Sequence, residues 1–448
     1  MKRLVSAIAA AGLATLLAPA GLVPAGAAAP HRASTPIQHL VVMTQDQHSF
    51  DNYLGGHQGV DGIPAGVCLP VRAGAAKPCI SPYTIDSTSP RRQLRATAAS
   101  EKVAVDGGRM DGFIRAQASR ESNGRLAMGH YSTEDVPGLA GLADRGVVFD
   151  RWFGSLPGGS ISNRLFQVTA RPIADQVQVP ENGWPQLPTI FDRLTAAGVS
   201  WRVYVENYEP ALNVRNASDR ALSGGQVARV PLLAMPRYLD DPAVMRHVVD
   251  LSQYYRDIAS GHLPAVSYVV STASSEHAPA APARGQRLIR AVANALIASD
   301  EWSSSALILN YDSSGGWYDH VRPPTIAGRP LGLRVPAALI SPYTAPDSVD
   351  HTVYDSAAVL KFIERNWSLP ALTSRDRNAA DLRNVFRFSA GQQATSLIGP
   401  TAGRPPVKQP HRAILYVGYG LALSIGVLVL IWVLPGRVRP RLLSGVRG

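Results

Sequence analysis

The sequence predicts an α/β fold, in which a mainly parallel sheet is flanked by helices and one transmembrane helix is added near the C-terminal end. Three observations support this fold class. Apolar, β-rich runs alternate with helical patterns, polar side chains suited to chemistry follow directly after several strands, and a long uncharged run stands near the end. The predicted strands are residues 37–43, 147–152, 201–205, 265–270, 306–310 and 335–340, and the predicted helices are 136–143, 189–197, 288–298 and 356–367.

Composition indicates that most of the chain is folded. Of the 448 residues, 46% are hydrophobic and 17% are charged, against roughly 25% charged residues in an average soluble domain. This length accommodates one large domain or two ordinary ones. Two cysteines are too few for a disulfide framework or for a structural zinc site built from cysteines.

The net charge of +11 does not by itself indicate nucleic-acid binding. Six of the 44 basic residues lie at the two ends of the chain, which leaves 38 basic residues against 33 acidic ones. Between the ends, the sequence has no dense stripe of Lys and Arg interleaved with aromatic residues, which is the usual footprint of nucleic-acid binding. We therefore expect no nucleic-acid partner.

Residues 1–29 have the pattern of a secretory signal peptide. A short basic start precedes an apolar stretch, small residues follow, and Ala-Gly-Ala at 25–27 offers a cleavage site. An uncleaved membrane anchor is the alternative, and Pro19 and Pro24 argue against it because they interrupt the run.

Residues 413–434 form an apolar run of 22 residues without a charge, which as a helix would reach roughly 33 Å and span a bilayer core. Arginines follow it in the tail 435–448, so the positive-inside rule places this tail in the cytoplasm and the rest of the protein outside. A buried core helix is the alternative, but such helices usually carry polar residues on one face. The polar, proline-containing residues 389–412 are then a linker, and residues 30–388 are the working domain, held at the cell membrane.

An extracytoplasmic domain stands in an oxidising compartment. Cys68 and Cys79 lie near each other in a loop rich in Gly and Pro, so we expect a disulfide between them. In the chain-entropy account, so small a loop contributes at most about 3 kcal/mol to stability. Two free thiols are the alternative.

The ends of four predicted strands carry side chains that suit the transfer of an oxyanion group. In a parallel sheet, ligands bind at the carboxyl ends of the strands, so these side chains are expected to meet there. Taken singly, each of these residues could equally be a helix cap, an ordinary turn residue or a solvated loop histidine. Only their joint position at the strand ends favours a catalytic or binding site. The candidates are Asp46 and Gln47 after the first strand, Ser160 and Asn163 after the second, His277 after residues 265–270, and Asp312, Ser313 and His320 after residues 306–310.

Hydrolysis of a phosphate ester would use these residue types. The ester is an anion that repels nucleophiles, and oxygen-ligated metal ions can screen its charge. Pro-Gly-Gly before Ser160 would expose this hydroxyl at a helix N-terminus, where backbone N–H groups favour an anion. A protonated histidine could assist the leaving oxygen.

The same residues resemble motifs of the bacterial phosphoesterase family that includes phospholipases C and an acid phosphatase. The resemblance runs in order from about residue 36 to 388 and implies an alkaline-phosphatase-like core. The segments that resemble the family's QENRSFDHYFG, GGKMDGF, PGPTxPNRLF, EHPP, TYDEGGGFYDHVPPP and VDHTVYDHTSVLRFIE are residues 45–55, 107–113, 157–166, 276–279, 310–324 and 349–364.

The resemblance also implies roles, with three departures. Asp46 replaces Glu and Gln47 replaces Asn, two changes that could compensate each other in reach. Ser313 replaces the second carboxylate of an Asp-Glu metal pair, and this loss of a charged ligand predicts weaker metal binding or an inactive site. By position, Ser160 matches the nucleophile, Asn163 an orienting residue, Asp46, Gln47, Asp312 and Ser313 the ligands of metal and phosphate, and His277 and His320 histidines near the metal or the leaving group.

We therefore expect a membrane-anchored extracytoplasmic phosphoesterase that needs a divalent metal ion, with phospholipid head groups as the first substrate hypothesis. Oxygen-rich ligation favours a hard cation, and the two histidines leave zinc or iron open. One alternative is a phosphomonoesterase, and another is a catalytically silent relative that binds a phosphorylated surface ligand. A purely structural ectodomain would not need a hydroxyl and histidines at strand ends.

Overall fold

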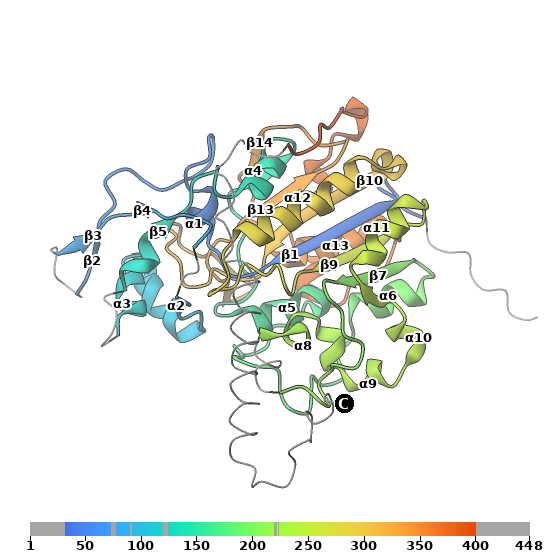
Figure 1. Ribbon diagram of the computed structural model, residues 1–448, viewed down its shortest axis with the longest axis horizontal. Helices are drawn as coiled ribbons and strands as arrows, with labels where there is room; N and C mark the ends of the chain where they lie inside the picture. The colour runs from blue at the N-terminus through green and yellow to red at the C-terminus, as the bar shows by residue number, and fades with distance from the viewer. Residues whose placement is uncertain are drawn as a thin grey trace, which may run out of the picture.

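An eight-stranded sheet forms the centre of the protein (Figure 1). The computed structural model describes residues 32–399 except 73–77, 90–91, 120–123, 219–221 and 223. Within this part of the chain, β13 runs antiparallel to its two neighbours and the other strand pairs of the sheet are parallel, which confirms the predicted mainly parallel sheet. Across the sheet the strands are β14 (Ser348–Asp350), β6 (Val147–Phe149), β13 (Ala337–Ile340), β10 (Ser305–Tyr311), β1 (His39–Gln45), β9 (Val266–Val270), β7 (Trp201–Val205) and β8 (Val248–Asp250).

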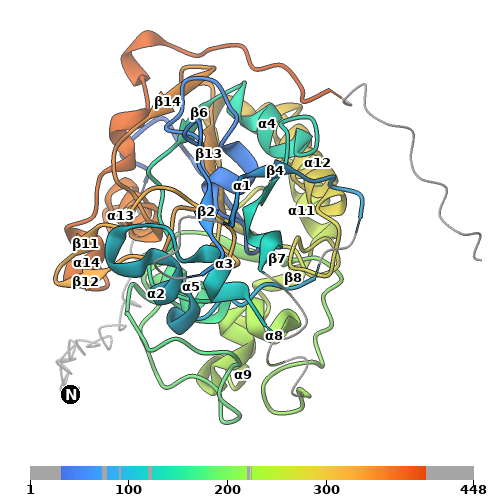
Figure 2. The same ribbon diagram turned by 90° about the vertical axis from the view of Figure 1, so that its left-hand side faces the viewer.

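Helices cover both faces of the sheet, as Figures 1 and 2 show. The longest helix, α12, turns an apolar stripe toward the strands, since its buried residues recur at intervals of three and four, whereas α5 and α13 are buried nearly all round. One face carries α4 (Pro137–Ala143), α11 (Ser252–Ala259) and α12 (Ala283–Ile297), and the other carries α5 (Ser160–Thr169), α6 (Ile190–Ala196) and α13 (Ser356–Asn366).

The central strands β1 and β10 bring distant parts of the sequence to one edge of the sheet. Both are buried along nearly their whole length because helices lie on both faces, which explains their continuous apolar character. They pair in parallel, with Gln45 opposite Tyr311 at their carboxyl ends. β9 pairs in parallel with the other side of β1. The residues that follow these three strands therefore leave the sheet at the same edge.

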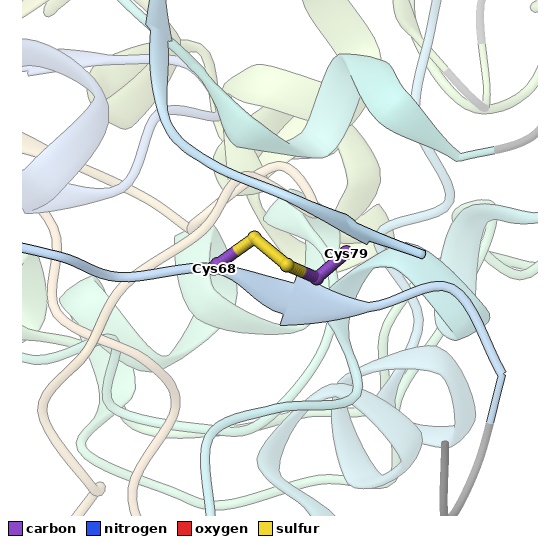
Figure 3. Close-up of a disulfide and its surroundings, with 2 residues drawn as sticks. All are labelled: Cys68 and Cys79. Carbon is purple, nitrogen blue, oxygen red and sulfur yellow. A yellow bond between two sulfur atoms is a disulfide. The ribbon is translucent and has the colours of Figure 1, made fainter. Parts of the chain in front are cut away.

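An irregular layer stands beyond this edge, where β1 leads into α1 (Figures 1 and 2). Within it Cys68 and Cys79 form a disulfide with a Cα–Cα distance of 5.4 Å (Figure 3), so the predicted disulfide is confirmed. The elements of this layer are α1 (Phe50–Leu54), β2 (Leu69–Pro70), β3 (Cys79–Ile80), β4 (Tyr83–Thr84), α2 (Ala98–Val105), α3 (Phe113–Gln117) and β5 (Gly129–His130).

Short elements connect the main ones. They include the hairpin β11 (Thr325–Ile326) and β12 (Arg329–Pro330), the helices α8 (Gln226–Arg229), α9 (Pro236–Leu239), α10 (Pro242–Met245) and α14 (Ser374–Arg377), and the 3-10 turns Asp106–Gly108, Arg125–Met128, Pro231–Ala234, Asp300–Ser304, Leu382–Val385 and Phe388–Ala390.

The packed chain continues past residue 388, where the domain was predicted to end. Ile398 is buried, and Asn294 of α12 donates from Nδ2 to its carbonyl oxygen at 3.0 Å. The first part of the predicted linker thus lies against the domain. The predicted signal peptide, transmembrane helix and tail lie outside the described residues, and none of the described helices combines the length and apolarity that crossing a bilayer requires.

Candidate active site

Asp46, Gln47 and Asp312 come together because β1 and β10 are parallel neighbours. Gln45 and Tyr311 end the paired strands, so the next residues leave the sheet side by side. The backbone N–H of Gln47 donates to Asp312 Oδ1 at 3.2 Å. Gln47 has a φ of 56°, a left-handed conformation that is uncommon for residues other than Gly and that is often found at functional sites.

Ser160 begins α5 and directs its hydroxyl at the same point. Its Oγ donates to Asp312 Oδ1 at 3.0 Å and accepts from Gln47 Nε2 at 3.0 Å. Ser313 Oγ lies 3.5 Å from Ser160 Oγ and donates to Asp312 Oδ1 at 3.2 Å. Four of the predicted site residues, from three segments of the chain, therefore form one contiguous polar cluster.

Asp46 is buried beside this cluster and contacts other partners. Its Oδ1 accepts from Arg164 Nη2 at 2.9 Å, Arg229 Nε lies 3.3 Å from each carboxylate oxygen, and Ser275 Oγ donates to Oδ2 at 2.5 Å. Burial alone would raise the pKa of Asp46, but the positive charges of Arg229 and Arg164 hold this pKa well below its ordinary value. The predicted metal ligand is therefore an ionised partner of two arginines.

Arg164 links the two strand-end carboxylates and was not predicted as a site residue. Its Nε donates to Asp312 Oδ2 at 2.9 Å, while its Nη2 donates to Asp46 Oδ1 at 2.9 Å, and its side chain is buried. A helical spacing of four residues puts Arg164 on the same face of α5 as Ser160, and this spacing could have pointed to it. Arg229 comes from α8, away from any strand end, and no comparable signal marks it.

Asp312 is the group best placed to receive a proton from Ser160. Burial raises the pKa of Asp312 to about 6, the charge of Arg164 opposes this rise, and the charge of Asp46 adds to it. A general base is most effective when its pKa lies near the working pH. Asp312 therefore has both the contact and the proton affinity that activation of Ser160 requires.

Asn163 holds the turn before Ser160. Its Oδ1 accepts from the backbone N–H of Leu156 at 2.9 Å, and its Nδ2 donates to the carbonyl oxygens of Leu156 and Gly159, each at 3.1 Å. These contacts use both hydrogens of the amide. The orienting role predicted for Asn163 thus acts on the backbone of the turn.

The two backbone amides directly before α5 donate to protein carboxylates. The N–H of Gly158 donates to Glu101 Oε2 at 3.0 Å, and the N–H of Gly159 donates to Asp175 Oδ1 at 3.1 Å. These two amides are therefore held by protein carboxylates, and the predicted anion position at the helix N-terminus, which begins at Ser160, stays a prediction.

His277 lies in the wall of the cavity into which Ser160 opens. This cavity has a volume of about 380 Å³. Gln93 Nε2 lies 2.9 Å from His277 Nε2, so one ring nitrogen has a partner at the surface of the cavity. Burial lowers the pKa of His277, and the charge of Asp46 opposes this effect. The polar residues that line the cavity include Asp46, Gln47, Gln93, Ser160, Arg229 and His277.

His320 lies in a different cluster from Ser160. Its Nδ1 is 2.7 Å from Asp51 Oδ2 and its Nε2 is 3.0 Å from Asp61 Oδ1. Burial alone would lower the pKa of His320, but the hydrogen bond and charge of Asp51 raise this pKa above its ordinary value. The structure does not bring His320 to the cavity that Ser160 and His277 line, because the segment after β10 carries it away.

The donors around Ser160 fit a hard divalent cation. Asp312 Oδ1 and the hydroxyls of Ser160 and Ser313 converge there, and the carboxamide of Gln47 can present its oxygen by turning half a turn about its last bond. Hard cations prefer such oxygen donors. Because Asp312 is the one carboxylate among these donors, they offer a cation little negative charge.

A second group of possible metal ligands already contacts the guanidinium of an arginine. The ligand atoms of Asp51, Asp319 and His320 lie within 4.8 Å of one another. Arg334 is buried among them and donates to Asp51 Oδ1 and Asp319 Oδ1, each at 2.9 Å. A guanidinium pairs with these carboxylates just as Arg164 pairs with Asp312, so charge does not separate the two groups. The second group differs in that it does not line the cavity that Ser160 lines.

Known proteins resemble this chain in sequence over most of its length. The model of the phosphoesterase family matches residues 37–370. The non-hemolytic phospholipase C of Pseudomonas aeruginosa is 28% identical over 86% of this chain, but the match spans only 63% of that protein, less than two thirds of its length. Phospholipase C A of Mycobacterium tuberculosis (strain H37Rv) is 27% identical, with 83% of this chain and 82% of that protein covered. Among solved structures, a phosphonate monoester hydrolase of Agrobacterium radiobacter has 10% identity and a TM-score of 0.38, with 82% of this chain and 79% of that one covered.

Proposed function

Because this chain belongs to the phosphoesterase family and is a hydrolase of phosphate ester bonds, we propose that it works through a covalent intermediate on Ser160. The observation that carries this proposal is the hydrogen bond from Ser160 Oγ to Asp312 Oδ1, at 3.0 Å, at the edge of the cavity. A nucleophile in contact with a base is the arrangement that such chemistry requires.

The reaction has two steps. In the first, Ser160 Oγ attacks phosphorus, its proton passes to Asp312 Oδ1, and the bond from phosphorus to the leaving oxygen breaks. In the second, water attacks the phosphorus on Ser160 and gives a proton to His277, which donated its own to the leaving oxygen in the first step. The bond from phosphorus to Ser160 Oγ breaks, and Asp312 returns its proton to the departing serine. Gln47 Nε2, 3.0 Å from Ser160 Oγ, fixes the direction of the hydroxyl when no cation is bound, and with a cation the amide would turn and present its oxygen instead.

Charge at the site comes from the protein and from a metal ion. A divalent cation held by Asp312, Ser160, Ser313 and the carboxamide of Gln47 would supply positive charge that screens the phosphate. Arg164 keeps Asp46 and Asp312 together at the end of the sheet. His277, when protonated, would donate to the leaving oxygen, and because burial lowers its pKa this form is populated on the acid side.

We propose phospholipid head groups as the substrate and the outer face of the cell membrane as the place of action. The relatives named above are phospholipases C, and the apolar run 413–434 would hold the domain beside lipid. The disulfide Cys68–Cys79 is consistent with an oxidising compartment.

Two alternatives make different predictions. Ser313, where the family has a carboxylate, favours a silent relative that binds a phosphorylated surface ligand, and a phosphomonoesterase would share the same chemistry. The test is hydrolysis by the purified full-length chain of 4-nitrophenyl phosphate, a monoester, and of phosphatidylcholine vesicles, a diester. We expect release of the diester head group with added divalent metal. Hydrolysis of only the monoester would favour the phosphomonoesterase, and hydrolysis of neither would favour the silent relative.

A further inference from the structure

Two carboxylates from outside the strand ends hold the turn that carries Ser160. Glu101 Oε2 accepts the N–H of Gly158 at 3.0 Å, and Asp175 Oδ1 accepts the N–H of Gly159 at 3.1 Å. These amides belong to the two residues directly before the nucleophile. Their directions therefore decide where Ser160 lies relative to Asp312.

Asp175 joins three walls of the cavity. Besides Gly159, it accepts at Oδ2 the N–H of Ala98, the first residue of α2, at 2.6 Å. Residues 93–97 before it and Gln176 and Val177 after Asp175 line the cavity. One carboxylate thus connects the nucleophile turn with the two walls that face it.

The backbone of the turn is shaped to fit against Asp175. Gly158 has a φ of 109°, and a Cβ atom on it would lie 2.5 Å from the carboxylate carbon of Asp175. Only glycine is compatible with both the conformation and the close approach. The carboxylate of Asp175 therefore packs directly against the backbone of the turn, and a movement of either would break this contact.

Glu101 connects the turn with the far side of the site. It is buried, and its Oε1 accepts the N–H of Leu333 at 3.0 Å. Leu333 directly precedes Arg334, which holds Asp51 and Asp319. Burial raises the pKa of Glu101, and its two N–H partners oppose this rise because they stabilise the ionised form, which accepts at both oxygens. A buried carboxyl group of this kind is costly unless its hydrogen bonds are needed.

We propose that Glu101 and Asp175 are positioning residues that set the distance between Ser160 Oγ and Asp312. This inference rests on the proposed function, because it assigns the carboxylates a part in the same reaction. A carboxylate offers both oxygens as acceptors, whereas an amide of the same shape offers one oxygen and an NH₂ group that opposes an N–H donor. In Asp175→Asn or Glu101→Gln, one of the two backbone N–H groups that the carboxylate held would face an NH₂ group instead of an oxygen. We expect the turn before Ser160 to shift as a result.

The test uses the full-length chain with Asp175→Asn and Glu101→Gln, and with Asp144→Asn as the control. Asp144 is an exposed acid, so its conversion to an amide changes the charge by the same amount without touching the turn. The first measurement is hydrogen exchange of the backbone amides of residues 158–160, which does not depend on activity. We expect faster exchange in the two variants of the turn and unchanged exchange in the control.

The second measurement is steady-state hydrolysis of a phosphate ester. A misplacement of about 1 Å can cost roughly 100-fold in rate, so we expect kcat to fall by about 10- to 100-fold while KM changes little. A role in stability alone would lower the melting temperature and leave kcat of the folded fraction unchanged, and this result would overturn the proposal. Unchanged exchange in both variants would overturn it as well.

The two measurements also separate this inference from the proposed function. If the wild type hydrolyses no phosphate ester, the proposed function fails, and the proposal that the carboxylates position Ser160 is then decided by the exchange of residues 158–160 alone. If Glu101→Gln does not fold, Asp175→Asn decides the test, because Asp175 is only half-buried.

Discussion

Arg164 and Arg334 are buried arginines that each bridge two carboxylates, and only the cluster around Arg164 belongs to the candidate active site. Arg164 bridges Asp46 and Asp312, and each of its two contacts is 2.9 Å long. Arg334 bridges Asp51 and Asp319, again with two contacts of 2.9 Å.

The two clusters differ in what their carboxylates face. In the Arg164 cluster, Asp312 Oδ1 turns toward the hydroxyls of Ser160 and Ser313 at the edge of a cavity of about 380 Å³. In the Arg334 cluster, the second oxygen of Asp51 holds both the backbone and the ring of His320. In the Arg164 cluster, a carboxylate oxygen thus accepts from a hydroxyl that can react. In the Arg334 cluster, the carboxylate oxygens accept from groups that only hold the fold together.

This comparison teaches that buried charge alone does not identify a site. Both clusters consist of residue types that would suit phosphate or metal chemistry, and both lie beyond strand ends. What separates them is a nucleophile in contact with a base and access to a cavity. The predictions below test whether this distinction is correct.

The largest expected effect is on catalysis at the Arg164 cluster. Ser160→Ala should lower hydrolysis of a phosphate ester by more than about 10³-fold, because it removes the nucleophile, and it should leave the fold intact. His320→Gln should retain most of the turnover, since His320 stands in the other cluster. Measurement of kcat in both variants checks this. Loss of turnover in His320→Gln with a normal melting temperature would show that the two clusters act together.

Next in size is the effect on stability, which should be alike in the two clusters. Arg164→Met leaves Asp312 without its cation while Asp46 keeps Arg229, and Arg334→Met leaves Asp319 without its cation while Asp51 keeps His320. Each variant should therefore cost about 3–5 kcal/mol of the free energy of unfolding. Arg215→Met is the control, because its pair with Asp240 is exposed and should matter by less than about 1 kcal/mol. Urea denaturation measures all three. If Arg334→Met costs no more than the control, the Arg334 cluster does not stabilise the fold as we describe.

A smaller effect concerns metal binding at Ser313. Its hydroxyl is a weak neutral donor 3.2 Å from Asp312 Oδ1, so Ser313→Glu adds a full charge at the proposed cation position. We expect divalent-metal affinity to rise by about tenfold or more in calorimetric titration, while Ser303→Glu at an exposed position leaves it unchanged. Equal affinities in wild type and Ser313→Glu would mean that residue 313 does not face a metal.

The smallest effect is on the pH dependence of turnover. Asp312 accepts a proton only when ionised, and burial raises its pKa to about 6. Below about pH 6 the rate should therefore fall by about tenfold per pH unit. It should fall again on the alkaline side, because His277 must be protonated and burial lowers its pKa. Asp312→Asn should lose this inflection together with most of the rate. A wild-type profile without an inflection between pH 5 and 7 would argue against Asp312 as the base.

Much of the fold and part of the site could be predicted from the sequence. The apolar runs that became β1, β7, β9, β10 and β13 are buried on both faces, so their composition alone marked them as strands. Gln47, Ser160, Asp312 and Ser313 were predicted together because parallel strands deliver their following residues to one edge. The short strands β8 and β14 were missed because three residues carry too little pattern.

The remaining site residues depend on tertiary structure. Glu101 reaches the nucleophile turn from α2, far from any strand end, and Arg229 reaches Asp46 from α8. His320 follows β10 and lies beyond the same edge of the sheet as Ser160, as the sequence predicts. This edge holds more than the cavity, however, and His320 does not line the cavity. Its destination was set by Asp51 and Asp61, and no sequence spacing shows that contact.

The central claim is that Ser160 carries the phosphoryl group during turnover, and trapping that intermediate tests it most directly. The full-length chain is mixed with a phosphate ester, quenched in acid within the first turnover, digested, and examined by mass spectrometry. We expect phosphate on Ser160 in the wild type, and none in Ser160→Ala or in a wild-type sample quenched before substrate is added. Hydrolysis with the phosphate on another residue, or undiminished turnover in Ser160→Ala, would contradict the account.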